Sequence, residues 1–314
     1  MSDPTVHHLS KDLATTGFST AHEPALRVRA GSGDRVAFET DDAAYAEMEQ
    51  VLDLARLTAP LNPITGPVWV EGAHPGDLLA VTVHDIALAE FGWSVYLPGA
   101  GALSPVMGEQ MLVRRVPVDT EGVHLGGGLV VPAKPMVGCL GVAPASGSAS
   151  TVMPSYPTGG NMDLTEVGPG TTVYLPVQVE GALFSLGDVH AVMSRGESSF
   201  VAIETAGTVT VSLDVVPAAQ AGGTGLPWLE TDDEVVFVGL GDPVQDSVQA
   251  AYEALFGHLT AHGWDPMDAY VAMSAIAHTE LGGPTGSVDP DPLHPLRPVG
   301  AVTLARFPRG LVQR

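Results

Sequence analysis

The residues with the clearest potential for chemistry are a carboxylate and an imidazole two positions apart, Asp188 and His190. They follow the apolar run 181–187 (Gly-Ala-Leu-Phe-Ser-Leu-Gly), whose length and composition are typical of a buried strand. Because residues two apart in an extended strand point to the same face, both side chains are expected to converge on one side of the backbone. Such a pair can hold a metal ion or direct a base towards a water molecule.

A second pair, Asn161 and Asp163, repeats this spacing directly after Gly159 and Gly160. Two polar pairs of this kind, each beside glycine and amid apolar sequence, indicate one shared site. The alternative is that each pair forms a turn in which the aspartate accepts backbone N–H bonds. The residues alone leave both interpretations open for Asp188 and His190, and they favour a turn for Asn161 and Asp163 taken separately.

Four further carboxylates end or flank strands that we expect near these pairs: Asp41, Glu71, Glu197 and Glu204. Any one of them could instead be a helix cap or a solvated strand edge. A serine nucleophile is not indicated, because Ser185 lacks the first glycine of a Gly-x-Ser-x-Gly elbow. Cys139 has apolar neighbours and is expected to be a buried core residue. A hydrolase without Ser or Cys chemistry needs a metal or a carboxylate base to activate water, and this sequence supplies both kinds of group.

Charge and composition exclude several classes of partner. Thirteen basic residues against 36 acidic ones give a formal charge of −23, which repels nucleic acid and anionic membranes at long range. Neither glycine-rich run, 99–101 or 126–128, has the context of a phosphate-binding loop, so no nucleotide cofactor is expected. The beginning of the sequence lacks a secretory signal pattern, and no stretch of eighteen apolar residues occurs. We therefore expect a soluble, cytoplasmic protein.

The 37 glycines and 26 prolines divide the chain into short apolar runs, as in an all-β sandwich or barrel. Strands are expected at 25–30, 35–40, 67–71, 78–86, 172–179, 199–204, 208–216 and 234–240. Helices are expected at 42–56, 243–261 and 266–278, with Asp265 as the N-cap of the last. The fold class is thus mainly β, a sandwich- or barrel-like body with a helical C-terminal hairpin, α+β overall. The expected organisation is one domain over 1–314, with a β-rich body at about 20–240, a helical segment at about 243–280 and a Pro/Gly-rich tail at 282–314.

The sequence resembles the acetamidase/formamidase family. The resemblance spans roughly residues 20–280, and the segments that carry it are 61–77 (LNPITGPVWVEGAHPGD), 136–144 (MVGCLGVAP), 159–163 (GGNMD), 181–191 (GALFSLGDVHA) with Gly196-Glu197, and 269–274 (AYVAMS). The run 191–195 (AVMSR) and the residues after Ser274 depart from the family pattern, which puts substrate identity and subunit contacts in doubt.

The resemblance implies a metal-assisted amidase that hydrolyses formamide- or acetamide-type amides, contains a divalent metal such as zinc and forms a homo-oligomer. On this interpretation Asp188 and His190 bind the metal with Asp41 or Asp163, Glu71 or Glu204 accepts the proton of the attacking water, and Asn161 orients the substrate; Glu197 is also a catalytic candidate. Two alternatives stay open: a metal-dependent hydrolase or lyase of another small C–N compound (an imide, carbamoyl or guanidino compound), and a non-catalytic binding homologue.

Overall fold

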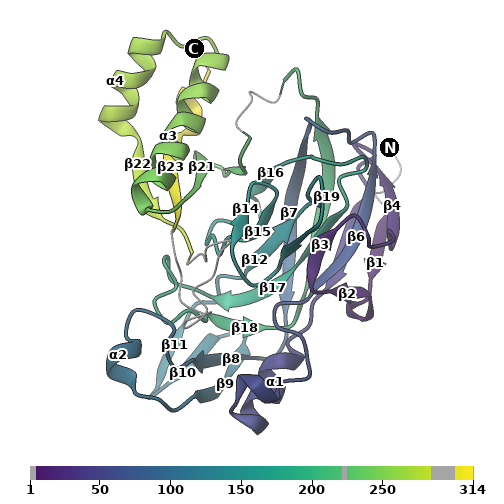
Figure 1. Cartoon of the computed structure of the whole chain (residues 1–314), viewed down its shortest axis with the longest axis vertical. Helices are drawn as coiled ribbons and strands as arrows, with labels where there is room; N and C mark the ends of the chain where they lie inside the picture. The colour runs from purple at the N-terminus through teal and green to yellow at the C-terminus, as the bar shows by residue number, and fades with distance from the viewer. Residues whose placement is uncertain (1–4, 221–224, 284–300, 314) are drawn as a thin grey trace.

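The computed structural model of the chain describes residues 5–220, 225–283 and 301–313 (Figure 1). Two large sheets dominate it. The nine-stranded sheet has the order β1 (Val6–Leu9), β5 (Arg35–Glu39), β19 (Gly207–Val216), β7 (Leu78–Leu88), β16 (Thr172–Pro176), β20 (Trp228–Glu230), β21 (Glu234–Gly241), β23 (Ala301–Pro308) and β22 (His278–Leu281).

The second sheet has twelve strands and carries the site. Its main path is β11 (Leu129–Val131), β10 (Gly122–Gly126), β9 (Leu112–Asp119), β8 (Phe91–Tyr96), β18 (Ile203–Thr205), β17 (Phe184–Val192), β12 (Met136–Gly141), β15 (Gly159–Asn161) and β14 (Ser155–Tyr156). Off this path, β6 (Ile64–Glu71) pairs with β17, and β2 (Ala14–Thr15) and β4 (Leu26–Arg29) pair with β6. A separate small ladder joins β3 (Gly17–Ser19) to β13 (Ser148–Ser150).

The main core lies between the two large sheets and draws buried side chains from both. Phe38 on β5 meets Phe184 on β17 edge to face, with ring centroids 5.7 Å apart. The strand expected at 208–216 is confirmed as β19, in which Val209, Val211 and Leu213 are all buried. Each such side chain contributes about 1.5–3 kcal/mol by leaving water. The prediction of a mainly β body is confirmed.

The helices are α1 (Ala43–Val51), α2 (Ser104–Met107), α3 (Val244–Ala261) and α4 (Pro266–Ile276), and 3₁₀ turns span Lys11–Leu13, Leu54–Arg56 and Arg309–Leu311. α3 and α4 pack on β21 and β23 at one end of the molecule, whereas α1 and α2 lie with β8–β11 at the other (Figure 1). The predicted cap of α4 is confirmed, because the Asp265 side chain accepts hydrogen bonds from the Met267 and Asp268 amides. None of the helices in the described ranges is long and apolar enough to cross a membrane.

Several expected boundaries were wrong. The helix expected over 42–56 ends at Val51, because Leu52 takes a left-handed conformation and Asp53 caps a new 3₁₀ turn. The strand expected at 199–204 is shorter, since β18 covers only Ile203–Thr205. The Pro/Gly-rich tail contains β23, which lies between β21 and β22 in the sheet; the loop expected over 282–299 lies largely outside the described residues. His258, within the helix expected over 243–261, is buried against Trp228 and Phe237.

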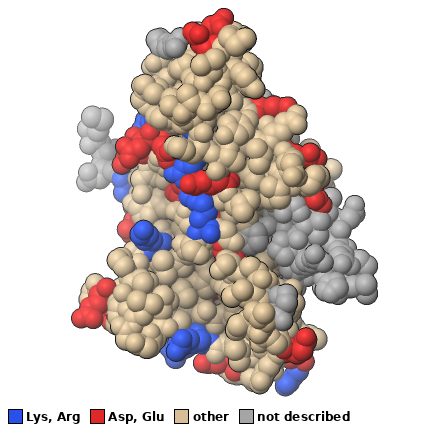
Figure 2. Space-filling view, turned by 90° about the vertical axis from the view of Figure 1, so that its left-hand side faces the viewer, with Lys and Arg blue, Asp and Glu red and all other residues tan. Residues whose placement is uncertain are grey.

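The charge of −23 does not produce an uninterrupted acidic surface. On the face that Figure 2 shows, basic side chains lie directly beside acidic ones in the middle of the molecule, and neutral residues cover most of the rest. Other basic groups on this face, lower in the view, lie apart from that central cluster.

Candidate functional site

The site is built on β17 at the point where the strand pairs with β12 and β18. Asp188 and His190 point to one side of β17, and His190 Nε2 lies 3.6 Å from Asp188 Oδ2. Antiparallel pairing places Glu204 of β18 opposite His190, with Glu204 Oε2 3.2 Å from His190 Nε2. The three side chains are only 1%, 4% and 4% exposed for His190, Asp188 and Glu204. Strand register therefore creates a buried group of two carboxylates and one imidazole.

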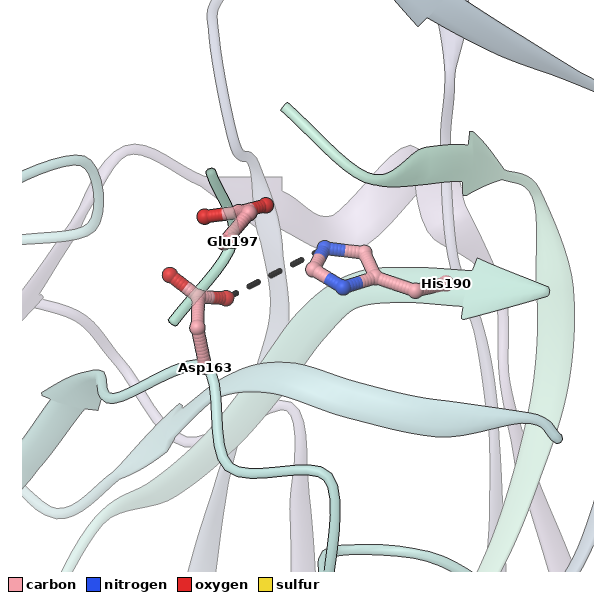
Figure 3. A group of neighbouring side chains, drawn as sticks. All are labelled: Asp163, His190 and Glu197. Carbon is pink, nitrogen blue, oxygen red and sulfur yellow. Dashed lines mark ion pairs between the residues drawn. The ribbon is translucent and has the colours of Figure 1, made fainter. Parts of the chain in front are cut away.

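Two loops bring further carboxylates to the same imidazole (Figure 3). Asp163 follows β15, and its Oδ1 lies 3.9 Å from His190 Nε2. Glu197 lies in the loop between β17 and β18, and one ligand atom from each of Asp163, His190 and Glu197 falls within 4.8 Å of the others. Asn161 Nδ2 donates a hydrogen bond to Asp163 Oδ2 at 3.0 Å. Six of the eight residues selected from the sequence thus lie together.

Asp41 and Glu71 do not join this group. Asp41 Oδ1 accepts a hydrogen bond from the Ala43 amide at the start of α1 and contacts Lys11 Nζ, at 3.0 and 3.4 Å. Glu71 is the exposed last residue of β6, where it lies in register with Arg29 of β4. Asp41 thus lies at a helix start and Glu71 at an exposed strand end, the two alternatives that the sequence left open for such carboxylates.

Gly138 forms the floor of the site, which the sequence analysis missed. It lies on β12 beside β17, and a Cβ at this position would lie 2.5 Å from both Asp163 Oδ1 and Asp188 Oδ2. Only a residue without a side chain therefore lets the carboxylates approach as closely as they do. The one signal in the sequence is a glycine inside an otherwise apolar strand.

The backbone is strained around the site. Eight non-glycine residues of the described chain have positive φ, and five of them line the site cavity: Asn62, Asp163, Asp188, Glu197 and Phe200. Such conformations cost about 1–3 kcal/mol each and persist where the surrounding structure enforces them, which is typical of functional sites.

A cavity of about 50 Å³ opens onto these groups. Asn161 and the acidic cluster line one part of it. An apolar wall from α1, β8 and nearby loops contains Met48, Leu54, Leu61, Val95, Leu97, Phe200 and Val201. Tyr45 of α1 also lines the cavity, and its hydroxyl lies 3.4 Å from Asn62 Oδ1. Because one water needs roughly 10–15 Å³ on this measure, the cavity suits a ligand of only a few heavy atoms.

Burial and mutual repulsion dominate the electrostatics. Burial raises the pKa of Asp163 well above its usual range, and the charges of Glu197 and Asp188 raise it further. Burial likewise raises the pKa of Glu197 to about 8 and that of Glu204 above its usual value, although His190 opposes both shifts. For His190 burial lowers the pKa, but the charges of Glu204 and Asp188 outweigh it and the net shift is strongly upward. The site therefore contains more buried negative charge than its own imidazole can balance, and a cation would relieve the excess.

The donor groups fit a divalent metal ion. Asp163 Oδ1 and Asn161 Oδ1 are buried, and neither has a hydrogen-bond partner within the described structure. Ligands placed about 2.0–2.1 Å from an ion in tetrahedral geometry lie roughly 3.3–3.4 Å apart, close to the 3.2 and 3.6 Å that separate His190 Nε2 from Glu204 and Asp188. Imidazole and carboxylate are both ligands of zinc. Asp188, His190 and Glu204 therefore form the group best suited to hold it.

Comparison with known proteins finds a partial match to one family. The model of the acetamidase/formamidase family matches residues 143–280, which contain all six clustered residues. Over this part, which is less than half of its length, the chain is similar to the acetamidase/formamidase family. It is 28% identical to an acetamidase of Mycolicibacterium smegmatis over 274 residues, 66% of this chain and 67% of the relative. The curated relatives are matched over 51% to 67% of their own length.

Solved structures extend the likeness to the whole chain. A predicted acetamidase/formamidase from the thermophile Thermoanaerobacter tengcongensis has a TM-score of 0.85 and 28% identity, covering 98% of this chain and 97% of that one. An acetamidase from Yersinia enterocolitica has a TM-score of 0.84 and 26% identity, covering 100% and 94%. The resemblance in the sequence motifs is thus accompanied by the same fold, including the C-terminal region where the motifs end.

Proposed function

We propose that this protein is an amidase of the acetamidase/formamidase type, which hydrolyses a short aliphatic amide, of the formamide or acetamide type, to a carboxylate and ammonia. The observation that carries the proposal is the cavity itself, a space of about 50 Å³ whose lining combines buried carboxylates and one imidazole with an apolar wall. A small amide matches both walls, with its polar group at the carboxylates and its acyl group at the apolar side chains. The names of the relatives support the same chemistry.

Asp188, His190 and Glu204 would hold a divalent ion, with zinc as the first candidate. Glu204, expected from the family resemblance to act as a base, suits ligation better because its Oε2 lies 3.2 Å from His190 Nε2. When bound, such an ion lowers the pKa of water and polarises a carbonyl oxygen.

Glu197 is the best candidate for proton transfer. It lies on a loop at the cavity and has its pKa raised to about 8, near the range in which a general base is effective. Its carboxylate would accept the proton of the attacking water and pass it to the amide nitrogen, which leaves as ammonia. Asn161 would orient the substrate, because its Nδ2 already binds Asp163 while its Oδ1 is free to accept an amide N–H.

The test is ammonia release from formamide, acetamide and propionamide by purified protein, before and after chelation and with zinc added back. Loss and recovery of activity are expected. Activity towards guanidino, imide or carbamoyl compounds without amide turnover would favour the alternative hydrolase or lyase. Absence of turnover and of metal binding would favour a binding homologue.

We further propose a cytoplasmic homo-oligomer with no nucleic-acid or membrane partner. Support for the assembly comes from α4, which leaves the apolar side chains of Met267, Tyr270 and Val271 exposed. Light scattering after size-exclusion chromatography would test the assembly, and a monomeric mass at micromolar concentration would contradict it.

A further inference from the structure

The two carboxylates that reach the site on loops are tied to each other by one arginine. Arg195 lies two residues before Glu197, whereas Thr165 and Glu166 follow shortly after Asp163. Arg195 Nη2 donates to Thr165 Oγ1 at 2.9 Å and forms an ion pair with Glu166 Oε1. A single side chain therefore joins the Glu197 loop to the Asp163 loop.

The same arginine joins both loops to β21, β23 and β22, the C-terminal end of the nine-stranded sheet (the C-terminal sheet). Arg195 Nε lies 2.9 Å from Glu280 Oε2 on β22. Arg306 of β23 contacts the same two glutamates, with its Nη1 2.5 Å from Glu166 Oε1 and 3.1 Å from Glu280 Oε2. Arg306 Nε also donates to Glu234 of β21 at 3.0 Å. The two arginines and three glutamates form one network, in which the Glu166 side chain is only 7% exposed.

The backbone at the end of β22 supports the Asp163 loop independently. The Gly283 amide donates to the Met162 carbonyl at 3.3 Å. A Cβ on Gly283 would lie 2.3 Å from Asp163 Cβ, so the two segments are in direct contact. The C-terminal sheet thus contacts the loop of Asp163 through both its side chains and its backbone.

Asp163 and Glu197 need this support because their backbone conformations and their charges both oppose the arrangement. Asp163 and Glu197 both have positive φ, at 47° and 39°, and neither lies within a strand. Their side chains also repel each other in a buried environment. A strained, mutually repelling pair stays close only if its surroundings hold it there.

We propose that Arg195 is a positioning residue that, with Arg306, fixes the loops of Asp163 and Glu197 against the C-terminal sheet, and thereby holds both carboxylates beside the Asp188–His190–Glu204 group and sets the metal affinity of the site. The part that concerns metal rests on the proposed function. The role requires a guanidinium, because its fork of donors reaches Glu280 through Nε and Thr165 and Glu166 through Nη2 at once. A lysine ammonium has the charge but not this geometry.

The test compares three variants of the full chain: Arg195→Met, Arg195→Lys and Arg309→Met. Arg309 is the matched control, since it follows β23 and pairs with Glu230, away from both loops. Hydrogen exchange is followed over 162–168 and 194–200, and cobalt or zinc affinity is measured by competition with a chromophoric chelator. For Arg195→Met we expect at least tenfold faster exchange in both segments and about 10–100-fold weaker metal binding, as for other residues that orient metal ligands. Arg195→Lys should give exchange rates and a metal affinity between those of Arg195→Met and wild type, and Arg309→Met should match wild type in both.

The outcomes separate the inference from the proposed function. A folded Arg195→Met protein with wild-type metal affinity would overturn the inference and leave the proposed function intact, whether or not exchange changes. A wild-type protein that binds neither cobalt nor zinc would overturn the metal part of both. A Glu166→Gln, Arg195→Met double variant provides a further check, because its losses should be far from additive if the two side chains act as one unit.

Discussion

Gly138 of β12 lies beside Asp188 on the neighbouring strand β17, and the side chains around Gly138 leave no room for even one methyl group. A Cβ there would lie 2.5 Å from Asp188 Oδ2 and from Asp163 Oδ1, and 3.0 Å from His190 Cε1. The closeness of the ligand atoms thus depends on an absent side chain as much as on the groups that are present.

Gly138→Ala should therefore displace both carboxylates. We expect metal affinity and turnover to fall about tenfold or more, with a loss of about 1–3 kcal/mol in the free energy of unfolding from overpacking. The measurements are chelator competition, kcat/KM for acetamide and urea unfolding. Gly257→Ala is the control, since a Cβ in the middle of α3 meets no atom within 4 Å and should add about 0.5–1 kcal/mol of stability without affecting activity. Wild-type activity in Gly138→Ala would contradict this prediction, because it would show that the site accommodates a methyl group at residue 138 without displacing the carboxylates.

Asp188→Asn and His190→Ala should abolish turnover while leaving the fold intact. Asp188→Asn keeps the shape of the side chain but removes one charge from a group with excess negative charge, so the metal-free variant should be at least as stable as wild type. Its stabilisation by added zinc, about 2.7 kcal/mol in wild type at a hundred times Kd, should be lost. Thermal unfolding with and without zinc measures this, and Asp85→Asn at an exposed position of β7 is the control. Full activity in either site variant would remove Asp188 and His190 from the mechanism.

The sequence predicts those parts of the site that depend on local geometry. The convergence of Asp188 and His190 follows from the two-residue period of one strand, and their ring-to-carboxylate distance of 3.6 Å agrees with it. Glu204 and Glu197 could be singled out only as carboxylates that flank an expected strand, because their approach to His190 depends on the register of β18 and on a left-handed loop conformation.

Other parts could not be read from a strand-end pattern. A carboxylate at such a position can equally accept a hydrogen bond from the first amide of a helix, as Asp41 does, or face solvent, as Glu71 does. Gly138 acquires its role only when β12 pairs with β17, and Met48 only when α1 closes the cavity. β23 follows a proline-rich stretch and finds its partners about 60 residues upstream, which no local pattern indicates.

His258 should make the protein sensitive to acid independently of the site. Its ring is 6% exposed, packed on Trp228 and Phe237 and close to His262, and burial first and His262 second lower its pKa to about 4. Because the unfolded chain binds a proton near pH 6.5 and the folded chain only near 4, the stabilisation is full above 6.5 and is lost as the pH falls to 4. The shift corresponds to up to about 3 kcal/mol.

Urea unfolding of wild type and His258→Phe at pH 7 and pH 4.5 tests this prediction. Phenylalanine keeps the ring packing and cannot titrate, so the variant should lose less stability between the two pH values than wild type does. His8→Gln, on the exposed edge of β1, should behave as wild type. Equal losses in wild type and His258→Phe would mean that His258 is protonated freely in the folded state.

Met48 should limit the length of the acyl group. It is 1% exposed, belongs to α1 and forms part of the apolar wall of the cavity. Met48→Ala enlarges a cavity of only about 50 Å³ on the side where the acyl group is proposed to bind. Since one methylene in an apolar pocket is worth about 1–3 kcal/mol, the ratio of kcat/KM for butyramide to that for acetamide should rise about tenfold or more.

Enlarging the cavity also has a cost that the control must separate from specificity. Removing a buried methionine side chain is expected to lower the free energy of unfolding by about 2–5 kcal/mol, whereas Met48→Leu should cost less than about 1.5 kcal/mol and leave the butyramide-to-acetamide ratio near that of wild type. A general loss of stability lowers kcat/KM for both amides together, so only the ratio reports on the wall. If Met48→Ala remains folded with the ratio unchanged, the acyl group binds elsewhere, and the orientation proposed for the substrate in this cavity is reversed.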